Sequence, residues 1–141
     1  MGLWYSIGVA LGIGIALGTA IAGAFAPVRG ALLLASLIAA ACGYVLAFAV
    51  IDLHFLPAAS GAIGGLVGGP VTVELCRRTL ARGGTKVATA ILLVIAGALI
   101  AALALIPVAG YVEALLVIVF GLLQRRRGGD RYAGLRTLAR D

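Results

Sequence analysis

Residues 87–123 read VATAILLVIAGALIAALALIPVAGYVEALLVIVFGLL, an apolar stretch whose one charged side chain is Glu113. The stretch is too long for a single membrane crossing, because a helix needs only about 20 apolar residues to cross a hydrocarbon core of about 30 Å. Pro107 divides the stretch, since proline interrupts the hydrogen-bond ladder of a helix. The sequence therefore predicts two membrane helices here, over residues 87–106 and 108–123.

The rest of the chain has the same apolar character. Of its 141 residues, 63% are hydrophobic, 21 are glycine and 11% are charged, and the mean hydropathy is +1.19. A typical soluble domain is about 45–50% apolar with glycine already counted, and about 25% of its residues are charged. The composition excludes a soluble enzyme, a disordered chain and a nucleic-acid-binding module, and it predicts an all-α integral membrane protein.

Polar residues divide the apolar sequence into five expected spans. The three that precede the pair above cover residues 3–26, 31–51 and 58–75. Together the five spans form a transmembrane helical domain over residues 1–124. A basic cytoplasmic tail over residues 125–141 follows it.

The distribution of basic residues predicts the orientation of this bundle. The loop over residues 77–86 has four basic residues, and the tail after Leu123 has six. Basic residues collect in cytoplasmic loops, so both segments are expected inside, with two crossings between them. We therefore expect five helices in a bacterial cytoplasmic membrane, with the N-terminus outside and the C-terminus inside. If residues 58–75 form a re-entrant segment instead, four helices cross and the N-terminus lies inside.

Small residues recur at a four-residue spacing in two of the spans. This spacing gives a helix a flat face on which backbones approach closely, and in lipid such packing replaces the hydrophobic effect as the force between helices. These glycine-zipper faces either compact one bundle or join the chain to further copies or to a larger membrane complex. The glycines expected to carry the packing are Gly8, Gly12 and Gly18 in the first span and Gly61, Gly65 and Gly69 in the third.

Pro70 follows two glycines in the third span and predicts a kink or a break, because proline lacks a backbone donor. Broken helices line the substrate sites of many transporters. Glu113, the deepest carboxylate, is either a hydrated group near the interface or a proton- or cation-binding group that faces the bundle. The candidate ion or substrate pathway consists of Glu113, Glu74, Pro70 and Thr72.

Other polar groups have local explanations. Arg77 and Arg78 follow Glu74 at the spacing that predicts an ion pair on one helical face. Asp52 and His54 are close enough to share a metal ion, but no third ligand is near them in sequence, so a solvated loop is favoured. The single histidine excludes a Ser-His-Asp triad and a two-histidine metal site. No enzymatic activity, cofactor or metal is expected.

The basic tail has an amphipathic pattern. After the run of arginines that ends the last span and the pair Gly128-Gly129, residues 130–141 place apolar side chains at helical spacing among arginines. This pattern predicts a short amphipathic helix on the anionic cytoplasmic leaflet or against a partner, with a solvated, frayed tail as the alternative. The residues expected to contact lipid or a partner are Arg77, Arg78, Arg125, Arg126, Arg127, Arg131 and Arg136.

One further pattern spans residues 57–113. It consists of a glycine-rich helix over residues 61–69, then Arg77-Arg78, Gly83-Gly84 and Lys86, and finally two apolar spans. In this it resembles the later half of small uncharacterised bacterial multispan membrane proteins, of the domain-of-unknown-function type. The resemblance implies an architecture and no activity.

Two classes of function fit these residues. The first is a scaffold, assembly or regulatory subunit of a membrane complex, which packs through its glycine-zipper faces and its basic tail. The second is a small oligomeric transporter or channel that uses Glu113 and the broken, glycine-rich helix over residues 61–70. The first is favoured, because the sequence offers a single deep carboxylate.

Overall fold

The computed structural model describes residues 2–25, 30–51, 54–106 and 108–138, and of residues 31, 125 and 127–138 it describes the backbone alone. All regular structure in these ranges is helical. The helices are α1 (Leu3–Phe25), α2 (Ala31–Leu46), α3 (Phe55–Ala81), α4 (Lys86–Ala104) and α5 (Ala109–Leu138), and a π-helical segment, η1 (Ala47–Ile51), continues α2.

Four of these helices are long and apolar enough to cross a membrane: α1, α2 together with η1, α3 and α4. The apolar part of α5, Ala109–Gln124, is shorter. Large apolar side chains are exposed along the outer faces of α2, α4 and α5, where a soluble protein would present polar ones. The predicted class, an all-helical multi-pass membrane protein, is confirmed at this level.

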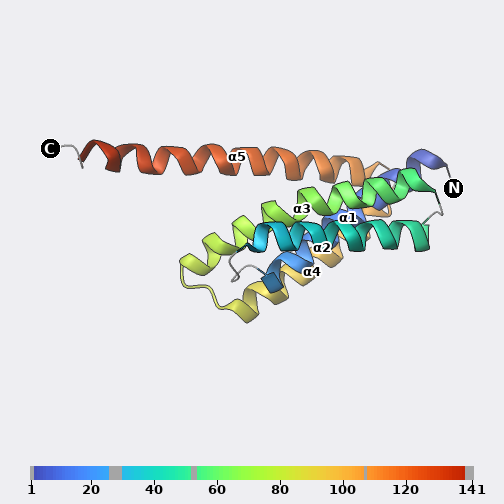
Figure 1. The fold of residues 1–141 in the computed structure, drawn as a ribbon, viewed down its shortest axis with the longest axis horizontal. Helices are drawn as coiled ribbons and strands as arrows, with labels where there is room; N and C mark the ends of the chain where they lie inside the picture. Colours follow the sequence, from blue (N-terminus) through green and yellow to red (C-terminus); the bar gives the residue numbers. More distant parts are fainter. Residues whose placement is uncertain (1, 26–29, 52–53, 107, 139–141) are drawn as a thin grey trace.

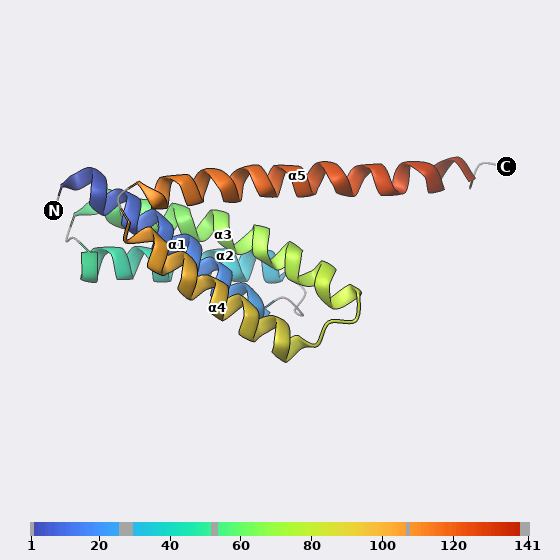
Figure 2. The ribbon, with the colours of Figure 1, turned by 180° about the vertical axis from the view of Figure 1, so that it is seen from behind.

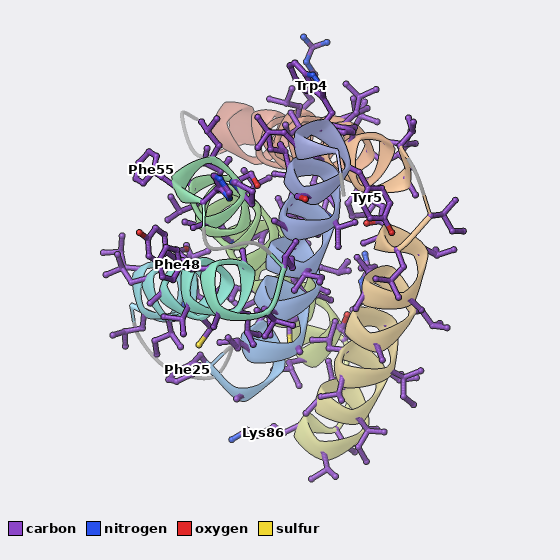
Figure 3. The ribbon with its side chains drawn as sticks, turned by 90° about the vertical axis from the view of Figure 1, so that its right-hand side faces the viewer. Trp4, Tyr5, Phe25, Phe48, Phe55 and Lys86 are labelled. Atoms are coloured by element: carbon purple, nitrogen blue, oxygen red, sulfur yellow. The ribbon has the colours of Figure 1, made fainter. Side chains whose placement is uncertain are left out.

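Helix α1 lies in the middle of the bundle and contacts each of the other helices (Figures 2 and 3). It runs in the same direction as α3, since Ile7 is paired with Ser60 near one end and Thr19 with Thr72 near the other. Its contacts with α4 run the opposite way, because Gly23 lies beside Ala90 and Gly12 beside Ala104. Contacts of α2 with α3 are likewise antiparallel, so successive helices alternate in direction.

Glycines bring α1, α2 and α3 to backbone contact. On α3, one strip of glycines faces α2: an added Cβ on Gly61 or Gly65 would meet the backbone carbonyl oxygen of Gly43 or Ala39. Gly69, on the same strip, lies beside the backbone of Ser36. The neighbouring strip, Gly64 and Gly68, faces the backbone of α1 at Leu11 and Ile15. The small-residue faces are thus occupied within the chain.

Helix α3 differs from its sequence prediction. The sequence predicts residues 58–75 with a kink or a break at Pro70, whereas α3 is one helix from Phe55 to Ala81 with Pro70 inside it, so the helix is not broken there. Its 27 residues correspond to about 40 Å of helix, which exceeds a hydrocarbon core of about 30 Å. Before Pro70 the glycines of α3 pack closely on α1 and α2, and after it Thr72, Val73 and Cys76 are buried, so packing holds the helix together although one hydrogen bond is lost.

Helix α5 also differs from its prediction. A separate amphipathic helix is expected after Gly128-Gly129, but α5 is one helix from Ala109 to Leu138. Its later part extends beyond the rest of the bundle (Figure 1). Two glycines cost a helix only about 1 kcal/mol each relative to alanine, so they do not by themselves end it.

Candidate functional site

The turn between α4 and α5 determines where the carboxylate of Glu113 lies. Its backbone is bonded locally, with Ile106 donating to the carbonyl oxygen of Leu103 over 2.9 Å and Ala109 to that of Ile106 over 3.1 Å. Val108 has a φ of 73°, in the left-handed region that a β-branched residue rarely adopts. This strained turn starts α5 directly against α1.

Helix α5 approaches α1 closely because both helices have glycine at the contact. A Cβ on Gly110 would meet the backbone carbonyl of Gly8, and a Cβ on Gly8 would lie 2.7 Å from Cε2 of Tyr111. One turn further along α1, a Cβ on Gly12 would lie 2.7 Å from Oε2 of Glu113. Gly12 therefore creates the space that the carboxylate occupies.

Three helices enclose this carboxylate. Glu113 belongs to α5, Gly12 to α1, and a Cβ on Gly12 would also meet that of Ala104, from the last turn of α4. Both carboxylate oxygens of Glu113 are shielded from solvent, and neither has a hydrogen-bond partner among the described residues. A buried carboxylate without a partner is costly unless it is neutralised. The arrangement favours a group that binds a proton or a cation.

Two tyrosines close the bundle near this site; we call this region the Tyr111 end. The Tyr5 hydroxyl donates to the carbonyl oxygen of Leu105 over 2.8 Å, and the Tyr111 hydroxyl donates to that of Trp4 over 2.7 Å. Each bond joins α1 to the helix or turn that carries the site. Sequence reasoning missed both tyrosines, although tyrosine is enriched where membrane helices meet the interface.

Ser6 is a second buried group without a partner. Its side chain is fully buried, and its hydroxyl makes no hydrogen bond to a described residue. A serine hydroxyl within a membrane helix ordinarily bonds a backbone carbonyl. Thr19 follows that rule, with a bond of 3.0 Å to the carbonyl oxygen of Ile15.

The other residues of the candidate pathway lie elsewhere. Thr72 is buried between α3 and α1, where its hydroxyl donates to Oγ1 of Thr19 over 3.5 Å. Thr19 lies two turns beyond Gly12 along α1, or about 10 Å by the helical rise. Glu74 and Pro70 line a different cavity, described below. The structure thus does not bring these three residues to Glu113.

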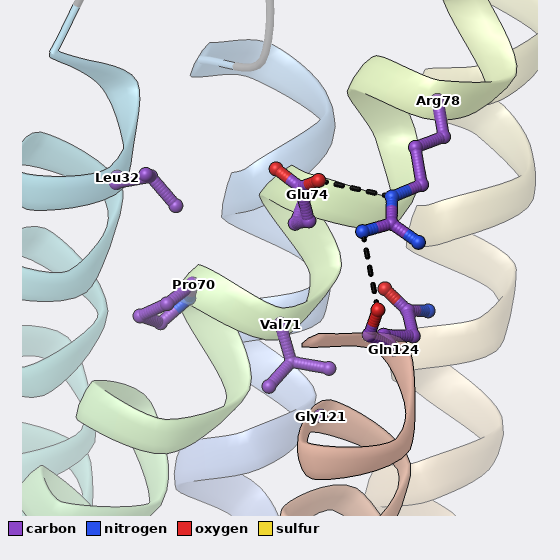
Figure 4. A pocket seen from close by; sticks show the side chains of 7 residues that line it. All are labelled: Leu32, Pro70, Val71, Glu74, Arg78, Gly121 and Gln124. Carbon is purple, nitrogen blue, oxygen red and sulfur yellow. Dashed lines mark hydrogen bonds and ion pairs between the residues drawn. The ribbon is translucent and has the colours of Figure 1, made fainter. Parts of the chain in front are cut away.

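At the opposite end of the bundle, which we call the Arg78 end, the predicted ion pair forms between Glu74 and Arg78. Nε of Arg78 lies 2.9 Å from Oε1 of Glu74, and its Nη2 donates to the backbone oxygen of Gln124 over 3.4 Å (Figure 4). Arg77, next to it, is half-buried, and Arg126 is exposed. The side chains of Arg125, Arg127, Arg131 and Arg136 lie outside the described residues.

The candidate metal pair is only partly described. Asp52 lies outside the described residues, and His54 is exposed at the N-terminus of α3. Among the residues that the structure describes, no three histidine, cysteine, aspartate or glutamate side chains gather into a metal-binding group.

Comparison with known proteins identifies no relative of the chain. No protein-family model, no curated protein and no solved structure matches the chain. The geometry around Glu113 is therefore the main guide to function.

Proposed function

We propose that the chain is a five-span protein of the bacterial cytoplasmic membrane that transports protons. Glu113 takes up and releases the proton. The observation that carries the proposal is the enclosed carboxylate, whose two oxygens have no hydrogen-bond partner among the described residues. A protonated carboxyl carries no charge and is far less costly to bury without partners than a carboxylate, whereas a bound metal cation needs several oxygen ligands. Proton binding is therefore the simplest chemistry for this site.

The alternation of helix directions supports the proposed orientation. The basic connection between α3 and α4 lies at the same end of the bundle as Gln124, because Arg78 bonds to that residue. The arginines that follow Gln124 are thus near the basic connection, as the positive-inside rule requires of two cytoplasmic segments. In this orientation the N-terminus is outside and Glu113 lies near the outer surface.

A flux measurement tests the proposal. The purified chain is placed in liposomes that contain a pH-sensitive dye, and an imposed potential drives protons across the membrane. We expect dye signals above those of empty liposomes, and we expect Glu113→Gln to abolish them. Glu74→Gln is the matched control, because Glu74 lies at the other end of the bundle in a partly exposed ion pair. A chain that moves no protons would refute the transport role.

Chemical labelling tests the site independently of flux. A hydrophobic carbodiimide reacts with a protonated carboxyl: the acid proton passes to a nitrogen, the oxygen bonds to the central carbon, and the adduct rearranges to a stable N-acylurea. We expect mass spectrometry to find this adduct on Glu113 and not on Glu74, which pairs with Arg78. Protection of Glu113 by sodium ions would assign a cation to the site in place of the proton.

A role in membrane assembly is the second candidate, and α5 is the observation that favours it. The glycine faces are occupied inside the bundle, but α5 extends beyond it as a lone helix (Figure 1). We propose that this extension contacts anionic lipid or a partner subunit, including a further copy of the chain. The test compares native mass and co-purifying proteins after mild solubilisation for the full chain and a chain ending at Gln124. Identical results for the two would contradict an assembly role for the extension.

A further inference from the structure

Helices α2 and α5 lie on either side of α3 and do not contact each other within their described residues. The space between them holds a cavity of about 220 Å³ on the surface of α3 (Figure 4). Pro70 and Val71 of α3 line it, with Leu32 of α2 on one side and Gly121 of α5 on the other. We call the whole cavity the α2–α5 groove, and these four residues make its apolar part.

The polar part of the α2–α5 groove is the ion pair at the Arg78 end. Arg78 and Glu74 line the same cavity, together with Gln124. Their side chains are 36% and 43% exposed, so a ligand reaches both. The guanidinium has five N–H donors, of which the bonds to Glu74 and Gln124 account for two. Both charged groups thus retain capacity for a ligand.

The position of the groove in the chain indicates its occupant. Gln124 ends the apolar part of α5, and the arginine run follows it directly. Arg78 lies beside this boundary, so the charges are at the level of lipid headgroups, while Val71 and Gly121, which also line the cavity, lie about one helical turn deeper than Glu74 and Gln124. The groove therefore has a charged end at the level of the headgroups and an apolar part within the membrane. A lipid matches this polarity, because its headgroup and its acyl chain occupy the same two levels.

We propose that the α2–α5 groove binds one phospholipid whose headgroup carries both a phosphate and a primary ammonium, namely phosphatidylethanolamine. The phosphate accepts hydrogen bonds from Arg78, the ammonium donates to Glu74, and an acyl chain lies over Val71 and Leu32. The charge balance selects this headgroup. Glu74 cancels the charge of Arg78, which removes the advantage of a purely anionic lipid. A choline headgroup has no N–H group to donate to Glu74.

Lipid retention measured by native mass spectrometry tests the proposal. The delipidated full chain is mixed with equal amounts of phosphatidylethanolamine, phosphatidylcholine and phosphatidylglycerol in detergent. We expect one phosphatidylethanolamine to be retained severalfold more than either competitor. Arg78→Gln should abolish retention of all three, whereas Glu74→Gln should shift the preference from phosphatidylethanolamine to phosphatidylglycerol. Arg82→Gln, at an exposed residue just beyond α3, is the matched control and should change nothing.

One further variant and one soluble competitor complete the experiment. Leu32→Trp fills the apolar part of the groove and leaves the ion pair in place, so it should lower retention even if a charge variant fails to fold. Soluble phosphoethanolamine carries the same charges without acyl chains, and we expect it not to displace the lipid. Equal retention of the three lipids, an unchanged preference in Glu74→Gln, or displacement by phosphoethanolamine would each overturn the proposal.

Discussion

The contact between α1 and α3 at Gly18 yields a quantitative prediction. A Cβ at this position would lie 2.6 Å from the backbone nitrogen of Gly69, 3.0 Å from the carbonyl carbon of Gly68 and 3.2 Å from the carbonyl oxygen of Gly65. Ordinary contacts of a Cβ begin at 3.4 Å, so the helices must separate by about 0.8 Å in Gly18→Ala. Backbone atoms on both sides leave no rotamer that relieves the clash.

The size of the effect follows from two opposing terms. Forcing an extra carbon into a packed contact costs about 1–3 kcal/mol, and a gap of about 0.5–1 Å removes a quarter to a half of the attraction between facing atoms. Replacing glycine by alanine within a helix returns about 1 kcal/mol through helix propensity. Because the shortest contact, 2.6 Å, is with a backbone atom, the cost falls in the upper part of its range, at about 2–3 kcal/mol. We therefore expect Gly18→Ala to lower the stability by about 1–2 kcal/mol, as the difference between the two terms.

Cys76 provides the assay. Its side chain is 2% exposed and its thiol is free, so it reacts with a thiol-specific dye only when the bundle opens. Cys42 is half-buried and is replaced by serine to leave one reporter. The temperature at which half of the Cys76 thiol reacts is then compared among variants in one detergent.

Gly69→Ala is the matched control for Gly18→Ala. Its added Cβ would lie 3.3 Å from Cα of Ser36, close to ordinary contact, and the ring of Pro70, the next residue, offsets the gain in helix propensity. We expect Gly69→Ala to be about as stable as the unsubstituted chain. Equal midpoints for Gly18→Ala and Gly69→Ala would refute the close approach of α1 and α3.

Three further predictions use the same thiol assay or the same liposomes. Val108 has a φ of 73°, and this left-handed conformation costs a residue other than glycine about 1–2 kcal/mol. Val108→Gly removes the strain at a smaller entropic cost, so it should raise the midpoint temperature of thiol labelling. A lower midpoint would contradict the strain. Tyr111→Phe should cost about 0.5–1.5 kcal/mol, since the carbonyl of Trp4 loses its donor, and an unchanged midpoint would show that this bond adds nothing. Gly12→Ala places a methyl 2.7 Å from Oε2 of Glu113 and should therefore reduce both carbodiimide labelling and proton flux. Full flux in this variant would show that proton transport does not depend on the space around Glu113.

The sequence predicts the helical membrane class well, because apolar length is a direct physical requirement of a bilayer. It predicts helix ends less well. Pro70 predicts a kink or a break, but residues buried on both sides of it keep α3 continuous, and α3 extends past Arg77 and Arg78 to Ala81. The ends of a helix depend on contacts with other helices as well as on the residues themselves.

The candidate site is predictable only in part. The sequence identifies Glu113 as a deep carboxylate, but nothing local to it indicates that Gly12 opens the space it occupies. Gly8 and Gly12 are expected to pack helices, yet their partner helix is set by the turn at Val108, far along the chain. Tyr5 bonds a carbonyl 100 positions away, and no short-range pattern records such a pairing.

The central place of α1 has a consequence for how the chain is made. During synthesis α1 enters the membrane before the other helices of the bundle, yet Gly8 packs on α5 and Gly12 on α4 and α5, which enter later. Until then, one face of α1 is covered only by lipid or by an insertion chaperone. The bond from Tyr111 to Trp4, 107 positions apart, forms only when α5 enters the bundle, and it fastens α5 to α1. Completion of this bundle is therefore a late event in biogenesis, and a ribosome that stalls before α5 leaves an open intermediate in the bilayer.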